Sequence, residues 1–220
     1  AQADIALARH LLATPVHCWS KRGDPGLVSL KQAVHPLIDN AAPLDVELSG
    51  KGAFISGQNG IGKSTLLRTV GINVAIARAF GFCYAHAAEL PALPVFASMQ
   101  NGDSMLGGES LYMAELRRAR ELLAAAQGPH AAVFIIDEIF RGTNHLESVS
   151  ASAAVLDQLA SHGLVLVSSH NLVLGSLLSH RLVPLRVIAL DGDKSRLVIE
   201  PGVLAHTNGI ALLATGGFDA

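Results

Sequence analysis

A glycine-rich loop between an apolar run and a long helical pattern constrains the fold of this chain more than any other feature. Residues 57–64 read Gly-Gln-Asn-Gly-Ile-Gly-Lys-Ser and satisfy the pattern Gly-x4-Gly-Lys-Ser/Thr. The run Ala53–Ser56 before the loop predicts a strand, and Lys63–Phe80 after it predicts a helix. A strand, a glycine loop and a helix in this order can cradle phosphate, because glycines turn backbone N–H groups inward and the helix N-terminus adds partial positive charge.

This loop predicts ATP and Mg²⁺ as ligands. We expect Lys63 to reach the β- and γ-phosphates and the Ser64 hydroxyl to bind Mg²⁺. The alternative is a glycine turn that only happens to precede a helix, and the flanking strand and helix disfavour it. The predicted ATP-binding residues are Gly57, Gln58, Asn59, Gly60, Ile61, Gly62, Lys63, Ser64 and Thr65.

An acidic pair follows a second apolar run. Val133–Ile136 is continuously apolar, which is typical of a strand buried on both faces of a parallel sheet. Asp137, at the end of this strand, is predicted to hold Mg²⁺, and Glu138 is predicted to be the general base that polarises the attacking water. Such a pair can also close an ordinary strand, but the phosphate loop in the same chain favours the catalytic interpretation. The Glu also favours hydrolysis over phosphoryl transfer to a small molecule.

His170 is the third candidate, and it follows the predicted buried strand Leu164–Ser168. Open α/β sheets place ligand chemistry at the carboxyl ends of their strands. A histidine there can donate to the γ-phosphate or to the attacking water, so we count it as catalytic with Lys63 and Glu138. The other nine histidines are interpreted as ordinary structural or surface residues.

A second glycine-rich stretch ends at Ser110 and leads into the predicted helix Glu109–Gln127. A hydroxyl and backbone donors at a helix start can contact an anion. Because the phosphate loop already holds the chain's own nucleotide, we expect Ser110 to contact the nucleotide of a neighbouring subunit, in trans. A connector with an ordinary helix cap remains an open alternative.

Strands that alternate with helices predict an α/β fold of three layers with a mostly parallel central sheet, as in P-loop NTPases. Arg186–Leu190 and Arg196–Glu200 predict a hairpin at an antiparallel edge. Residues 1–34 are expected to form an N-terminal remnant or linker that packs on a domain of residues 35–220. Other predicted elements are helices Ala3–Leu12, Leu146–Ser161 and Leu172–Leu178, strands Leu44–Leu48 and Val95–Met99, and a polar turn at Lys21–Gly26.

Composition limits the environment and the partners. The net charge of −2 gives no overall electrostatic footprint for nucleic acid. Cys18 and Cys83 lack metal or redox spacing, which favours reduced thiols in a reducing compartment. No apolar run approaches the roughly 18 residues of a membrane span, and no signal pattern opens the chain. We therefore expect a cytoplasmic location without membrane contact.

Taken together, the motifs resemble the ATPase domain of the MutS family. The resemblance runs from about residue 35 to about residue 215, in one order and at similar spacing. It rests on the phosphate loop with Asn59, Asp137–Ile139, Arg141–Asn144, Ser169-His170, Gly108–Ser110 with Met113 and Glu115, His35-Pro36 and Asn208–Ile210.

The resemblance implies a head-to-tail homodimer with two composite ATP sites. ATP would draw two such domains together, and hydrolysis to ADP and phosphate would release them. Ser110 would reach the partner's γ-phosphate, Arg141–Asn144 would lie at the dimer interface, and His170 would be the switch residue. DNA contact and mismatch repair would come through regions upstream of this sequence.

Departures from the pattern indicate a non-classical branch, for which a role in mismatch repair stays open. Phe140 stands where repair members usually carry Gly, and Glu109 stands where they tend to carry Arg. Two other interpretations also remain open. Leu106–Ser110 resembles the signature loop of an ABC-type transporter nucleotide-binding subunit, and a scaffold that barely hydrolyses ATP is the second. The intact Lys63, Asp137 and Glu138 disfavour the scaffold.

Overall fold

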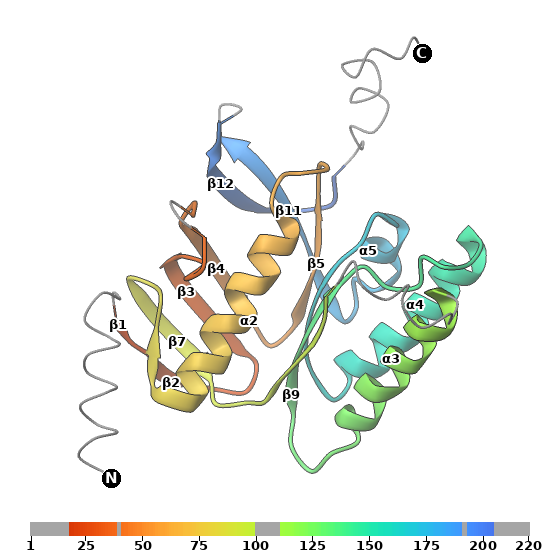
Figure 1. The fold of residues 1–220 in the computed structure, drawn as a ribbon, viewed down its shortest axis with the longest axis horizontal. Coiled ribbons are helices and arrows are strands. Elements are labelled where there is room, and N and C mark those ends of the chain that lie inside the picture. The colour runs from red at the N-terminus through yellow and green to blue at the C-terminus, as the bar shows by residue number, and fades with distance from the viewer. Residues whose placement is uncertain (1–17, 39–40, 100–110, 191–192, 205–220) are drawn as a thin grey trace.

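In the computed structural model, a six-stranded sheet separates two hydrophobic layers (Figure 1). The structure describes residues 18–38, 41–99, 111–190 and 193–204. The strand order is β12-β11-β5-β10-β9-β8, and every neighbouring pair from β8 to β11 is parallel. β12 pairs antiparallel with β11, so the predicted parallel sheet with an antiparallel edge is confirmed. The strands are β5 (Gly52–Gly57), β8 (Val95–Ser98), β9 (Ala132–Asp137), β10 (Gly163–Ser168), β11 (Leu182–Leu190) and β12 (Asp193–Pro201).

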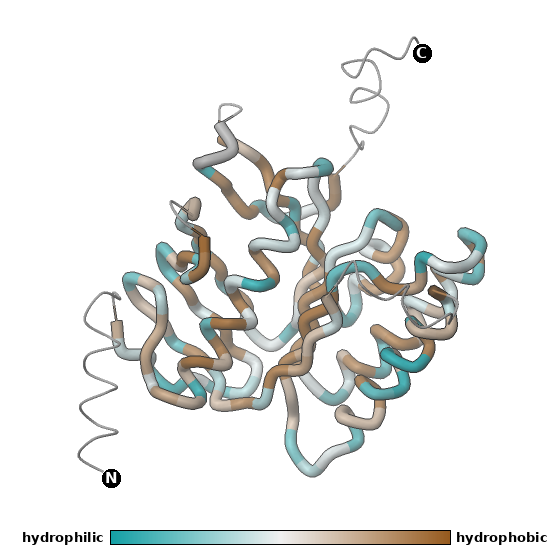
Figure 2. The backbone as a smooth tube through the Cα atoms, in the orientation of Figure 1, coloured by the Kyte–Doolittle hydropathy of each residue, from teal (hydrophilic) through white to brown (hydrophobic). Residues whose placement is uncertain are grey.

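The central strands are largely apolar because both of their faces are covered. Every residue of β5 and of β9 is buried. Successive side chains point to opposite faces, so Ala53 and Ile55 enter one core cluster while Phe54 enters the other. Figure 2 shows the most hydrophobic backbone gathered along these strands, with mixed hydropathy on the outer helices. This explains why the continuous apolar runs correctly predicted parallel strands.

Helices cover both faces of the sheet. α2 packs on one face through Leu66, Leu67, Val70 and Val74. α3, α4 and α5 pack on the opposite face, where Leu122, Leu156 and Leu174 join the second cluster. Among the described helices, α2 has the predicted bounds, and the ends of the other three differ from the prediction by one or two residues. The bounds are α2 Lys63–Phe80, α3 Leu111–Ala126, α4 His145–Ala160 and α5 Val173–Leu177.

A smaller sheet lies on the α2 side of the molecule, and the sequence analysis missed most of it (Figure 1). The smaller sheet has the order β2-β7-β3-β4. A separate two-stranded antiparallel sheet pairs β1 with β6. Lys21–Gly26 was predicted to be a polar turn, but it contains strand β2, because the short exposed strand pairs with β7. The bounds are β1 Cys18–Trp19, β2 Lys21–Gly23, β3 Leu27–Ala33, β4 Leu44–Ser49, β6 Phe82–Cys83 and β7 Ala87–Pro91.

The expected N-terminal linker is therefore partly strand. Its described residues supply β1, β2 and β3, and β3 pairs with both β4 and β7. A boundary at residue 34 thus falls directly after a strand of the smaller sheet. The predicted helix Ala3–Leu12, the glycine-rich stretch that ends at Ser110 and the segment Asn208–Ile210 lie outside the described residues.

Candidate functional site

Three neighbouring parallel strands end together and bring the candidate residues to one edge of the sheet. Ser168 at the end of β10 lies opposite Asp137 of β9 on one side and Ile55 of β5 on the other. The loop after β5 therefore lies beside the acidic end of β9. A cavity of about 390 Å³ occupies this place. Its lining comes from the predicted site residues Asn59, Gly60, Gly62, Lys63, Ser64, Thr65, Asp137, Glu138 and His170.

The loop owes its shape to two glycines with left-handed backbone. Gly60 has φ 72° and Gly62 has φ 107°, conformations that cost an L-residue energy and glycine little. Ile61 between them is buried in the core and anchors the loop from below. Gly62 is the N-cap of α2 and offers no side chain to the first-turn N–H groups. The start of α2 therefore presents backbone donors and partial positive charge beside the cavity.

Lys63 is buried at the base of this loop. Its ammonium group donates to the carbonyl oxygens of Gly57 at 2.9 Å and Gln58 at 3.1 Å. Burial lowers its pKa, while the charges of Glu138 and Asp137 act in the opposite direction. Both of these acceptors are neutral, so the Lys63 ammonium group would gain from an anion in the cavity.

Asp137 is buried and fixed by its neighbour on β10. The Ser168 hydroxyl donates to Asp137 Oδ1 at 2.6 Å, an interaction that sequence reasoning missed although Ser168 also ends a strand. Ser64 and Asp137 line the same cavity, and both carry side-chain oxygens of the kind that bind divalent cations. In the described part of the chain, no three His, Cys, Asp or Glu side chains are grouped to hold a metal. A cation here would therefore complete its shell with water or ligand oxygens.

Glu138 contacts His170 across the cavity rim. The His170 Nε2 atom lies 3.2 Å from Glu138 Oε1. The backbone N–H of His170 donates to Glu138 Oε2 at 3.4 Å. The Glu138 side chain is only 8% exposed, whereas that of His170 is 54% exposed. Burial raises the pKa of Glu138, and the His170 interaction opposes that shift. The structure thus brings the predicted base and the predicted switch residue together.

The turn after Asp137 has an unusual backbone. Glu138 has φ 63° and Phe140 has φ 52°, and neither is a glycine. The Phe140 ring is 1% exposed and belongs to the core on the α3 side of the sheet. A left-handed conformation at residue 140 gives a physical reason for the glycine that the MutS pattern usually places there.

Arg141–Asn144, expected at a dimer interface, also have contacts within the chain. Asn144 is the N-cap of α4 and accepts the N–H of Glu147 at 3.0 Å. The Thr143 hydroxyl donates to the Glu147 carboxylate. The N–H groups of Arg141 and Gly142 donate to Glu115 on α3, a contact that no local sequence signal indicated. Their predicted place at an interface stays a prediction.

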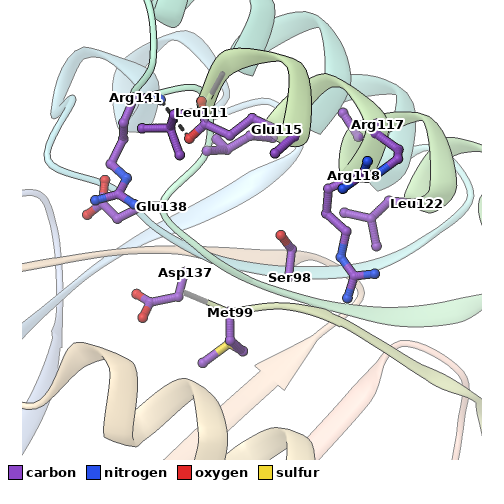
Figure 3. Close-up of a pocket in the computed structure, with 13 residues that line it drawn as sticks. Ser98, Met99, Leu111, Glu115, Arg117, Arg118, Leu122, Asp137, Glu138 and Arg141 are labelled. Atoms are coloured by element: carbon purple, nitrogen blue, oxygen red, sulfur yellow. Dashed lines mark hydrogen bonds between the residues drawn. The ribbon is translucent and has the colours of Figure 1, made fainter. Parts of the chain in front are cut away.

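A second cavity of about 410 Å³ adjoins the first (Figure 3). It shares Asp137 and Glu138 with the first cavity, and α3 supplies Glu115, Arg117 and Arg118 to its wall. The N-terminal half of α3 therefore lies next to the acidic end of β9.

Comparison with known proteins places this site in a family. The model of MutS domain V matches residues 53–207, a range that contains every predicted site residue. This chain belongs to the MutS family. The family resemblance inferred from its motifs is confirmed.

Curated MutS relatives are much longer than this chain. It is 27% identical to the DNA mismatch repair protein MutS of Thermus aquaticus over 199 residues, which cover 86% of this chain and 24% of that protein. It is 32% identical to the DNA mismatch repair protein msh3 of Aspergillus niger over 164 residues, 70% of this chain and 14% of that one. The chain therefore spans a quarter or less of these relatives. Among the described helices, none is long and apolar enough to cross a membrane.

Proposed function

We propose that this chain has the P-loop NTPase fold and that it binds ATP with Mg²⁺ and hydrolyses ATP to ADP and phosphate. The observation that carries this proposal is the convergence of Lys63, Ser64, Asp137 and Glu138 on one cavity at the carboxyl ends of β5 and β9. These residues come from two segments that are more than 70 positions apart in the sequence. Membership of the MutS family supports this reading over a transporter subunit.

Phosphate binding rests on the loop and the start of α2. Gly60 and Gly62 hold the backbone in left-handed conformations, and the first turn of α2 lacks a side-chain cap. Its N–H groups are therefore available to phosphate oxygens. Lys63 would exchange a neutral carbonyl for a charged phosphate oxygen, which makes a shorter and stronger hydrogen bond.

Ser64 and Asp137 would hold the magnesium ion, with Ser168 fixing the Asp137 carboxylate. When bound there, Mg²⁺ supplies positive charge that stabilises the phosphate oxygens during transfer.

Glu138 acts as the general base. The oxygen of a water molecule attacks the γ-phosphorus, the bond between that phosphorus and the ADP oxygen breaks, and the water proton passes to the Glu138 carboxylate. Burial raises the pKa of Glu138 and makes its carboxylate a better proton acceptor. His170 contacts that carboxylate and holds its orientation.

We also propose ATP-dependent pairing of two such domains, with Ser110 in trans. Support comes from exposed apolar side chains at the starts of α3 and α4, namely Leu111, Met113 and Leu146. Single exposed apolar residues are common, but Leu111 lies beside Gly142 of the turn between β9 and α4, and Leu146 follows that turn in the sequence. Because the relatives are DNA mismatch repair proteins, we propose that the cycle serves DNA repair through regions that this sequence does not include.

Equilibrium binding of ATP in the presence of Mg²⁺ tests the proposal. Lys63→Ala should weaken ATP binding by at least about 10- to 100-fold, because a charged hydrogen-bond donor to phosphate is lost. Lys51→Ala removes an exposed lysine at the opposite end of β5 and serves as the matched control, with binding unchanged. Wild-type affinity in Lys63→Ala would contradict the assignment of the phosphate loop.

A further inference from the structure

The turn that carries Glu138 needs support from outside itself. Glu138 and Phe140 both have positive φ, at 63° and 52°, and are separated only by Ile139. Side-chain-bearing residues keep such conformations only when surrounding contacts hold them. On the core side of the turn, Phe140 is buried, and the Ser152 hydroxyl donates to the Ile139 carbonyl at 3.3 Å.

On the outer side of the turn, the first turns of α3 make close contacts with it. Glu115 accepts the N–H of Arg141 with Oε1 at 2.9 Å (Figure 3). It also accepts the N–H of Gly142 with Oε2 at 3.0 Å. Both carboxylate oxygens are therefore used on two consecutive backbone groups. A charged acceptor makes each of these bonds stronger than a neutral one would be.

Close packing between α3 and the turn supports the same arrangement. A Cβ atom at Gly142 would lie 2.6 Å from the backbone N of Tyr112, so only glycine lets the turn approach the helix this closely. The rings of Tyr112 and Phe140 also lie with their centroids 6.3 Å apart. Helix and turn therefore meet at Glu115, at Gly142 and at Phe140.

We propose that Glu115 is a positioning residue for hydrolysis. By holding the N–H groups of Arg141 and Gly142, it fixes the turn so that the Glu138 carboxylate faces the cavity. This inference rests on the proposed ATPase function. Glu115 takes no part in nucleotide binding in this proposal, because it does not line the cavity that contains the phosphate loop. Its loss should therefore impair catalysis and spare nucleotide binding.

The test compares Glu115→Ala and Glu115→Gln with Glu121→Ala. Glu121 lies on the same helix, is exposed and pairs with Arg118, so its replacement is a matched control that leaves the turn untouched. Amide hydrogen exchange at Arg141 and Gly142 is measured in nucleotide-free protein, and kcat and the Kd for ATP are measured with Mg²⁺. In Glu115→Ala we expect exchange to accelerate and kcat to fall, each by about 10- to 100-fold, with Kd unchanged within about twofold.

Glu115→Gln should give intermediate values, because a Gln oxygen accepts one N–H while its amide group cannot accept the other. Unchanged exchange in Glu115→Ala would overturn the inference, whatever the ATPase result. So would wild-type kcat, or equal losses of binding and turnover, which would indicate a general structural role. If the wild-type protein shows no turnover while Glu115→Ala accelerates exchange, the ATPase proposal fails, and the hold of Glu115 on the turn is supported.

Discussion

Phe140 allows a direct measurement of backbone strain at the site. Replacing a buried Phe with Ala costs about 3–5 kcal/mol of stability. At an ordinary position Gly is worse than Ala by about 0.5–1 kcal/mol, because the unfolded chain gains freedom. At φ 52°, however, Gly relieves the left-handed penalty of about 1–2 kcal/mol that Ala keeps. We therefore expect Phe140→Gly to be more stable than Phe140→Ala by roughly 0.5–1 kcal/mol.

Urea unfolding of both variants measures this difference in the free energy of unfolding. Phe134 is the matched control, since it is fully buried but lies in the extended strand β9. There the usual order should hold, with Phe134→Ala more stable than Phe134→Gly by about 0.5–1 kcal/mol. If Ala were the more stable replacement at both positions, the strain attributed to the turn would be absent.

Two further predictions follow from shifted pKa values. Burial raises the pKa of Glu138, so the folded state favours its protonated form and loses stability as the pH rises above the ordinary glutamate value of about 4.3. The Glu138→Gln side chain cannot ionise, so the Tm of this variant should exceed that of the wild type at about pH 7.5, and the difference should vanish near pH 4. A variant with the same Tm as the wild type at both pH values would count against this prediction. Burial raises the pKa of Cys83 to about 12, so iodoacetamide at about pH 8 should alkylate Cys83 in the unfolded protein but not in the native protein. Peptide mass spectra measure the labelling. Rapid labelling of Cys83 in the native protein would contradict the prediction.

The central strands and the long helices were predictable because their residues carry the signal themselves. Val133–Ile136 is apolar on both faces, and both of those faces are covered by helices. Most strands of the smaller sheet were not predictable in the same way, although β4 lies where the strand Leu44–Leu48 was predicted. β2 is short and largely exposed, and it is a strand only because β7, more than 60 residues further along, pairs with it.

The same distinction holds at the site. Asp137, Glu138 and His170 lie at or just beyond the ends of parallel strands, and Lys63 opens the helix that follows β5. Topology therefore brings them to one edge of the sheet. Glu115 reaches Arg141 across 26 positions through the packing of α3, which no local pattern encodes. The left-handed backbone of Phe140 was equally hidden, because aromatic residues favour extended conformations and the tertiary contacts decide otherwise.

The most direct test of the account is ATP turnover by wild type and Glu138→Gln, measured as ADP formed at saturating ATP with Mg²⁺. The wild type should turn over ATP. Glu138→Gln should bind ATP as the wild type does but form ADP at least about 100-fold more slowly, since the phosphate contacts remain and the proton acceptor is gone. A wild type that forms no ADP, or a Glu138→Gln variant that hydrolyses ATP at the wild-type rate, would contradict the proposed role of this site.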